Sequence, residues 1–280
     1  MKEPNHFRRV VLWWLVACLI ATPLVVFVLG PTLPPGNGSE QASGQVVDNT
    51  VLLGLSTPIA LAVIVYFAYA LIAFRDRDPS EVRDGPGIRG HAAAQSWWIG
   101  VTTVIVLFLA VYGSVRMLDG GSGGGQGPNP IAKPAGANLG STLQVQVIAQ
   151  QWRFTFRYPS YGGVETNTLY LPAHRLVELH VTSLDVIHSF WAYQLGVKAD
   201  ANPGVDNVAY VETKQPLMFD VRCAELCGVW HGYMFDSGRV VTQAQFVSWI
   251  AQRRVQYAPV QKSLPPYSKS YYPDPQRRAG

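Results

Sequence analysis

Three long apolar stretches dominate the first half of the chain. They run from Val10 to Gly30, from about Val51 to Phe74, and from about Trp97 to Val115. Each is close to the roughly 20 residues that a helix needs to cross the hydrocarbon of a membrane. A buried core helix would carry polar residues along one face, and these stretches carry almost none. The pattern therefore predicts membrane-spanning helices.

The charges between these stretches predict their orientation. Three basic residues precede the first stretch, the link from 31 to 50 contains no Lys or Arg, and four arginines lie between 75 and 89. Positively charged segments remain in the cytoplasm. We therefore expect the N-terminus and the Arg-rich link inside, and everything after Val115 on the outer face of the cell membrane.

Residues 1–30 also resemble a secretory signal segment, because a basic start precedes an apolar run. The run Leu15–Cys18 even resembles a lipoprotein cleavage box. However, the residues after Cys18 remain apolar, and no small-residue cleavage site is evident before Glu40. This favours a retained helix. The membrane anchor then has three helices, or two if the first segment is cleaved as a signal.

The second half of the chain has a different pattern. A Gly- and Pro-rich stretch at 118–138 predicts a linker. Beyond it, short runs rich in β-branched and aromatic residues alternate with turn signals, which favours a β-sandwich or barrel. The clearest runs are Leu143–Ala149, Trp152–Tyr158, Leu176–Ser183, Val208–Thr213 and Leu217–Arg222. A short helix near 242–252 is expected to close the domain.

The pattern divides the chain into six parts. We expect a first membrane helix or signal segment at 1–30, an external link at 31–50, a transmembrane helical hairpin at 51–117, a linker at 118–138, a β-domain at 139–254 and an extended tail at 255–280.

Composition supports a membrane protein and excludes other classes. Only 14% of the residues are charged, against about 25% in a typical soluble domain. The net charge of +4, without a basic stripe that contains aromatic residues, gives no reason to expect nucleic-acid binding. Three cysteines are too few for a disulfide framework, and the absence of a Cys-x-x-Cys-His motif excludes an attached c-type haem.

Candidate metal ligands gather in the segment from Cys223 to Met234. It contains two thiols, the imidazole of His231 and a thioether within twelve residues. Soft sulfur ligands select copper, zinc or iron–sulfur clusters. The methionine favours copper, since zinc sites use Cys, His and carboxylate. A zinc or disulfide site is the alternative. A copper site needs a second imidazole, and His188, at the edge of a predicted strand, can supply it.

Two cysteines change the kind of copper site that is expected. One cysteine with two histidines and a methionine would make a blue-copper site. If both Cys223 and Cys227 bridge two copper ions, each metal also takes one histidine. Met234 then completes one copper, and the backbone carbonyl of Glu225 completes the other. A rigid frame of this kind suits electron relay.

The pattern C-x-E-x-C-x3-H-x2-M, preceded by D-V-x-H-S, resembles the CuA centre of the cytochrome c oxidase subunit II family. With the helical hairpin, the resemblance covers residues 50 to 250. It implies a cupredoxin-like sandwich on a helical membrane anchor, with a binuclear copper centre held by the six residues from His188 to Met234 named above. It also implies membership of a respiratory haem–copper oxidase complex in contact with lipid. A soluble or membrane-anchored cytochrome c or copper protein would donate electrons, and haem in subunit I would receive them for oxygen reduction coupled to proton translocation.

The resemblance extends to three further features. The segment from Gln151 to Tyr158 resembles the aromatic segment whose first tryptophan receives electrons from the carrier, which assigns that role to Trp152. The segment Lys198–Gly204 resembles the loop that faces subunit I, although Val205 replaces the usual arginine. The side chain of Glu225 would help to hold a magnesium or manganese ion shared with subunit I.

One position departs from the family pattern. Before the third helix the family often carries a glutamate at the mouth of a proton channel, and here Gln95 occupies that position. An amide cannot exchange protons as a carboxylate does. Proton uptake then either differs or uses a neighbouring acid such as Glu81 or Asp84.

Two other functions are compatible with copper ligands. Some nitric-oxide-reducing members of the haem–copper superfamily also carry a CuA subunit, and Gln95 leaves that alternative open. A membrane-tethered copper carrier is the other, but a carrier needs an open ligand set, whereas the ligand positions here predict a closed site. A quinol oxidase subunit would lack these ligands.

Overall fold

The computed structural model describes residues 5–75, 90–118, 123–134 and 142–261. They form two compact units: the first contains most of the helical residues up to Ser114, and the second contains residues 34–46 and the chain from Val115 onward. Glu81 and Asp84 lie outside the described residues, as do 262–280 of the predicted tail.

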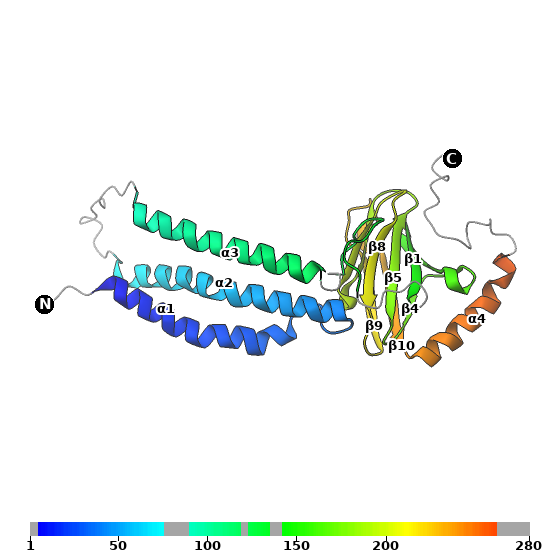
Figure 1. Ribbon diagram of the computed structural model, residues 1–280, viewed down its shortest axis with the longest axis horizontal. Helices are drawn as coiled ribbons and strands as arrows, with labels where there is room; N and C mark the ends of the chain where they lie inside the picture. Colours follow the sequence, from blue (N-terminus) through cyan, green and yellow to red (C-terminus); the bar gives the residue numbers. More distant parts are fainter. Residues whose placement is uncertain (1–4, 76–89, 119–122, 135–141, 262–280) are drawn as a thin grey trace. The chain divides into compact units, whose positions relative to one another are not determined.

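The first unit contains most of three long apolar helices (Figure 1). Helix α1 covers His6–Pro23 and continues through a π-helical segment, Leu24–Leu29, and a 3₁₀ turn, Gly30–Thr32. Helix α2 covers Glu40–Ala73 and α3 covers Ala92–Leu118. All three helices are long and apolar enough to cross a membrane. This confirms the predicted helical anchor by length and composition.

Specific contacts join these helices. The indole of Trp14 in α1 donates a hydrogen bond to the carbonyl of Pro58 in α2 at 2.8 Å, and the ring of His6 meets the hydroxyl of Tyr69 at 2.8 Å. Tyr112 of α3 donates to the carboxylate of Asp48 at 2.7 Å. In apolar surroundings such polar groups require internal partners, so these contacts are consistent with helices that pack within a membrane.

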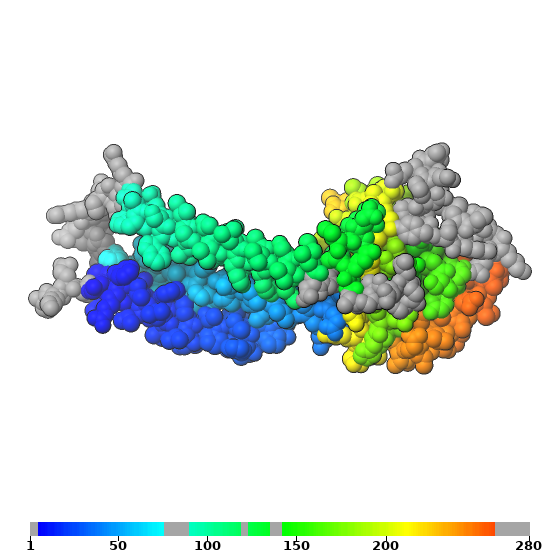
Figure 2. Space-filling view, in the orientation of Figure 1, coloured from blue at the N-terminus to red at the C-terminus, as the bar shows by residue number. Residues whose placement is uncertain are grey.

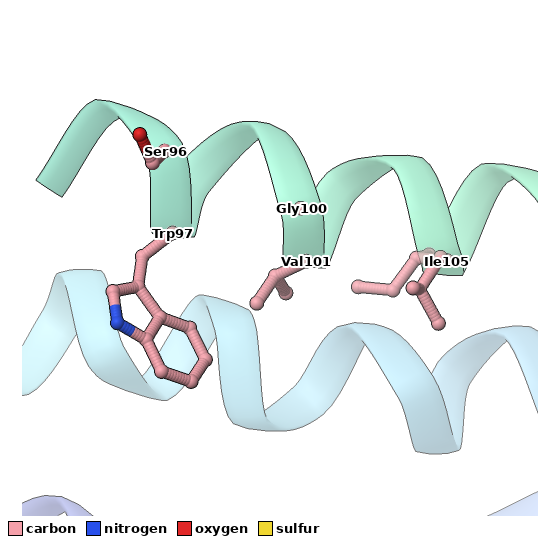
Figure 3. Close-up of a pocket in the computed structure, with 6 residues that line it drawn as sticks. Ser96, Trp97, Gly100, Val101 and Ile105 are labelled. Carbon is pink, nitrogen blue, oxygen red and sulfur yellow. The ribbon is translucent and has the colours of Figure 1, made fainter. Parts of the chain in front are cut away.

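Most of the surface of α3 is open, and none of its residues is buried (Figure 2). An apolar groove of 530 Å³ lies along it, lined by Ser96, Trp97, Gly100, Val101, Val104 and Ile105. In Figure 3 the Trp97 side chain projects from the same side of α3 as Val101. Trp97 and Trp98 are exposed, as expected for aromatic residues at a membrane boundary.

The second unit is a sandwich of two five-stranded sheets. One sheet has the order β3-β2-β1-β5-β8, with β1 parallel to β5, and the other has the order β4-β10-β9-β6-β7, with β4 parallel to β10. This confirms the all-β, cupredoxin-like sandwich. The strands are β1 Leu143–Gln150, β2 Arg153–Tyr158, β3 Val164–Thr166, β4 Leu169–Pro172, β5 Leu176–Ser183, β6 His188–Ala192, β7 Val197–Ala201, β8 Asn207–Glu212, β9 Leu217–Cys223 and β10 Phe235–Val241.

Apolar side chains at alternate positions of the strands form the core between the two sheets. Phe154, Phe156 and Tyr158 occupy alternate positions of β2, and all three are buried. Phe190 of β6 meets Phe154 edge-on, with ring centroids 5.8 Å apart. Because successive side chains of a strand point to opposite faces, this spacing places the three rings on one face. The same strands carry the candidate site at their ends.

Helix α4 spans Gln243–Gln261 and packs on the sandwich. Phe246 and Ile250 are buried, and Trp249 stacks on Tyr170 with ring centroids 4.2 Å apart. The helix continues beyond the range 242–252 expected from the sequence. The prediction of an extended tail from 255 is therefore wrong for residues 255–261, which are helical.

The start of α2 belongs to the sandwich unit, although the sequence predicted an external link there. The hydroxyl of Ser39 donates to the Leu195 carbonyl at 2.6 Å, and the amide of Gln45 donates to the Gly196 carbonyl at 2.6 Å. Ala42 is fully buried. Gly196 has a φ of 61°, and a Cβ there would lie 2.8 Å from the Ala42 Cα. Only glycine allows this close approach.

Part of the Gly-rich stretch predicted as a linker is also held against the sandwich. The backbone N–H of Lys198 donates to the Gly123 carbonyl at 2.8 Å, and the Gly125 N–H donates to the Lys198 carbonyl at 3.0 Å. Gln126 and Gly127 exchange backbone hydrogen bonds with Val208 in β8. Residues 123–127 thus follow the edges of both sheets, at β7 and β8.

Candidate metal centre

Three strands bring the predicted ligands together at one end of the sandwich. Strand β9 ends at Cys223, and β10 begins directly after Met234. The backbone N–H of Cys223 donates to the Met234 carbonyl at 3.2 Å, which closes the loop between them. Strand β6, which begins at His188, pairs with β9 so that Phe190 lies opposite Cys223. Strand pairing therefore places His188 beside a loop far away in sequence.

The two thiols occupy the centre of this arrangement. Their sulfur atoms lie 3.7 Å apart. The Cys223 sulfur is 3.8 Å from Nδ1 of His188, and the Cys227 sulfur is 3.6 Å from Nδ1 of His231. Each thiol thus has its own imidazole. Such a pairwise arrangement offers two similar sets of donor atoms rather than one.

Two weaker candidate donors lie beside the thiols. The Met234 sulfur lies 3.9 Å from the sulfur of Cys227, and the backbone carbonyl of Glu225 lies 3.2 Å from the sulfur of Cys223. All six residues predicted from the sequence around this centre are therefore within one cluster. The side chain of Glu225 is exposed.

The cluster is largely shielded from water. His188 is fully buried, Met234 is 1% exposed and Cys227 is 4% exposed. The ligand atoms of His188, Cys223 and Cys227 all lie within 4.8 Å of one another. Buried polar atoms require partners, and thiolate, imidazole and thioether donors together suit copper. The residues present therefore fit a copper site.

Burial also affects the protonation of the Cys227 thiol. It raises the pKa of the Cys227 thiol to about 12, and the neighbouring thiol of Cys223 contributes to the rise. The thiol is therefore protonated at neutral pH when no metal is bound. A metal ion must displace that proton, because thiolate is the form that binds metals.

A carboxylate that the sequence reasoning did not select lies behind His188. Asp185 accepts a hydrogen bond from Nε2 of His188 at 2.9 Å. It also accepts from the backbone N–H groups of Gln151 and Val186, each at 2.7 Å. Burial opposes ionisation of Asp185, but these hydrogen bonds outweigh it and lower its pKa. The D-V-x-H-S motif contained the residue, but its three-residue spacing from His188 did not reveal the contact with Gln151.

Trp152 lies directly beside the thiol loop. Its indole N–H donates to the carbonyl of Cys227 at 3.2 Å, and the side-chain amide of Gln151 donates to the same carbonyl at 2.9 Å. Gly228, with a φ of 115°, packs against the Trp152 ring. The residue proposed to receive electrons is therefore one hydrogen bond away from the backbone of a candidate ligand. No local pattern in the sequence points to the second donor, Gln151.

Comparisons with known proteins identify a family and several similar chains. The family described as cytochrome c oxidase subunit II, periplasmic domain, matches residues 163–241. Cytochrome c oxidase subunit 2 of Thermostichus vulcanus is 31% identical over 90% of this chain and 89% of its own length. The corresponding protein of Synechocystis is 29% identical over 76% of this chain and 74% of its own length.

Among solved structures, the periplasmic domain of subunit II of the Bradyrhizobium japonicum cytochrome oxidase is 29% identical, with a TM-score of 0.40. The match covers 42% of this chain and 96% of that one. A chain from a heme–copper terminal oxidase dimer is 19% identical, with a TM-score of 0.37, over 52% of this chain and 99% of that chain.

Proposed function

This chain belongs to the cytochrome c oxidase subunit II family, and from that premise we propose that it carries a binuclear copper centre of a respiratory haem–copper oxidase. The family makes it a subunit of an oxidoreductase complex. Its proposed task is to accept electrons from a cytochrome c or similar carrier and to pass them to haem in subunit I. The observation that carries the proposal is the pair of thiols, each with its own imidazole.

The chain's residues would divide the work of holding the metal. Cys223 and Cys227 would bridge two copper ions, with His188 on one side and His231 on the other. Met234 and the backbone carbonyl of Glu225 would complete the two ligand sets. When bound, the copper pair supplies a one-electron store whose geometry changes little on reduction. Pairing among strands β6, β9 and β10 holds these residues close together, which would limit movement of the protein during reduction.

Trp152 would provide the contact with the electron donor. It lies half-buried beside the Cys227 carbonyl, so its ring can meet a partner on one edge and the loop on the other. Exposed apolar residues also stand next to site residues in the sequence: Val229, which follows Gly228, is 89% exposed, and Ile187, which precedes His188, is 50% exposed. A surface of this kind suits a protein partner.

Glu225 would have a second role at the border with subunit I. Its carbonyl faces the Cys223 sulfur, which leaves the exposed carboxylate directed to other contacts. Hard cations such as magnesium and manganese prefer carboxylate ligands. We propose that this carboxylate supplies one ligand to such an ion and that subunit I supplies most of the others.

Neither alternative function is favoured. The relatives described above are all cytochrome c oxidase subunits, which favours oxygen over nitric oxide as the final acceptor. A copper carrier would need ligands that exchange readily, whereas His188 and Met234 are almost completely buried.

The decisive test is the copper content and spectrum of the purified full-length chain. We expect two coppers per chain and, in the oxidised state, a near-infrared band and an electron paramagnetic resonance signal of one electron shared by two metals. A single copper with a four-line blue-copper signal, or bound zinc instead, would contradict the proposal.

The orientation in the membrane can be tested separately with an impermeant thiol reagent. Ile131, which is 78% exposed in the sandwich unit, and Arg75, which follows α2, are replaced one at a time by cysteine. Because the sandwich is proposed to lie outside and the Arg-rich link inside, Ile131→Cys should be labelled in intact cells. Arg75→Cys should be labelled only after lysis. The reverse result would place the metal centre on the wrong face for the proposed function.

A further inference from the structure

Asp185 joins two parts of the site that are otherwise separate. One carboxylate oxygen accepts hydrogen bonds from Nε2 of His188 and from the Val186 N–H, and the other accepts from the Gln151 N–H. Gln151 directly precedes Trp152. The carboxylate therefore touches a candidate copper ligand on one side and the turn that bears the electron-accepting indole on the other.

The same turn is held from its opposite side by the thiol loop. The side chains of Gln151 and Trp152 both donate to the carbonyl of Cys227. The contacts thus form a closed circuit from Cys227 through Gln151 and Asp185 to His188, whose Nδ1 faces Cys223. Hydrogen bonds and close contacts therefore link the turn to both candidate thiol ligands.

The two candidate imidazole ligands differ in their burial and in the hydrogen-bond partner of Nε2. His188 is fully buried and has the Asp185 carboxylate behind it. His231 is half-exposed, and within the described parts of the chain its Nε2 has no hydrogen-bond partner. A carboxylate behind a ligating histidine fixes its tautomer and ring orientation and increases its basicity. The His188 half of the site is therefore the more tightly oriented and the more electron-rich.

We propose that Asp185 is a positioning residue that sets the orientation of His188 and the position of the Trp152 turn together. This rests on the proposed function, because it assumes that His188 binds copper through Nδ1. With Nδ1 directed to the metal, Nε2 carries the proton and donates it to the carboxylate. One side chain thereby couples the geometry of the copper site to the residue that meets the donor.

Two substitutions separate the two contacts. Asp185→Ala removes both of them. Asp185→Asn keeps one acceptor oxygen. The asparagine side chain retains the most hydrogen bonds if this oxygen takes the place of the carboxylate oxygen that faces His188 and Val186. Its NH₂ group then faces the Gln151 N–H, where two donors oppose each other. The asparagine variant should therefore disturb the Trp152 turn more than the histidine.

The test uses the full-length chain, with three measurements for each variant. They are copper affinity by competition with a chelator, the absorption spectrum of the copper-loaded chain, and the rate at which a cytochrome c reduces the bound copper. For Asp185→Ala we expect copper affinity to fall by about tenfold to a hundredfold, the usual effect of losing such a partner, with a changed spectrum and slower reduction. For Asp185→Asn we expect slower reduction with an affinity and spectrum closer to those of the unaltered chain.

A matched control is Asp206→Asn, because Asp206 also contacts a histidine ring, that of His180 at 3.1 Å, but lies outside the site. It should leave all three measurements unchanged. An Asp185→Ala chain with unaltered affinity and spectrum would overturn the inference, and so would an Asp185→Asn chain reduced at the normal rate. If the alanine variant does not fold, the asparagine variant decides. Failure of the unaltered chain to bind two coppers would instead refute the proposed function.

Discussion

Replacing Cys227 by serine should abolish the two-copper signal of the full-length chain. The Cys227 sulfur lies within 4 Å of the Cys223 sulfur, the His231 ring and the Met234 sulfur. A serine hydroxyl is a hard donor that stays protonated at neutral pH, so it cannot replace a soft thiolate that two coppers share. We expect at most one copper per chain and no near-infrared band, as measured by metal analysis and absorption spectroscopy.

The same change elsewhere in the chain provides the control. Cys18 lies in α1, within the first unit, and Cys18→Ser should leave copper content and spectrum unchanged. Cys223→Ser should behave as Cys227→Ser does, because the two thiols occupy equivalent places between the imidazoles. A Cys227→Ser chain that still holds two coppers with an unaltered spectrum would show that this thiol is not a bridge.

Replacing Trp152 by alanine should slow reduction of the copper centre by the electron donor while leaving its spectrum unchanged. The indole N–H donates a hydrogen bond to the Cys227 carbonyl, which is not one of the candidate metal-binding atoms. We expect the second-order rate to fall by about tenfold to a hundredfold, the scale on which misplaced reaction partners slow a reaction. Stopped-flow mixing of the reduced donor with the oxidised full-length chain measures this rate.

Trp191→Phe is the matched control for this experiment. Trp191 lies in β6 of the same sandwich, and its ring contacts Tyr193 rather than the thiol loop. Its replacement should not change the rate. A normal rate in Trp152→Ala, or a loss of copper from it, would show that electrons reach the site at another position.

The same measurement at several salt concentrations tests the character of the docking surface. Residues 139–250 carry 7 Lys and Arg against 9 Asp and Glu, a net charge of only −2, and the positively charged Arg153 follows Trp152. A weakly acidic surface gives little electrostatic steering of a basic cytochrome c. Salt screens only this electrostatic part of the attraction between the two proteins. We expect the rate to fall gently as salt rises, with apolar contact around Trp152 controlling association.

The sequence was most informative where chemistry depends on local spacing. The candidate ligands between Cys223 and Met234 lie in one loop, so a fixed spacing of sulfur and nitrogen donors is visible in the sequence itself. His188 was also predicted, because it stands at a strand edge within a distinctive motif. Gln151 and Asp185 were not assigned roles, since their contacts join segments 34 residues apart and no local pattern records such a meeting.

The same distinction holds for the fold. Both ends of β5 were predicted correctly, and those of β1, β2, β8 and β9 to within one residue, because each strand has many β-branched or apolar residues. Short strands such as β3 and β4 were missed, since three or four residues give too little pattern. Helix α2 begins at Glu40, well before the apolar run, because its first turns are stabilised by the sandwich rather than by their own hydrophobicity.

The attachment of residues 34–46 to the sandwich affects how a soluble fragment should be designed. A fragment that begins at Leu139 would omit Ser39 and the fully buried Ala42. It would also leave Lys214 without its ion pair to Glu40, at 3.1 Å. Apolar surface stripped of its cover favours aggregation. Residues 34–46 are thus part of the sandwich unit. A soluble fragment should include them, either by fusion or as a separate added peptide.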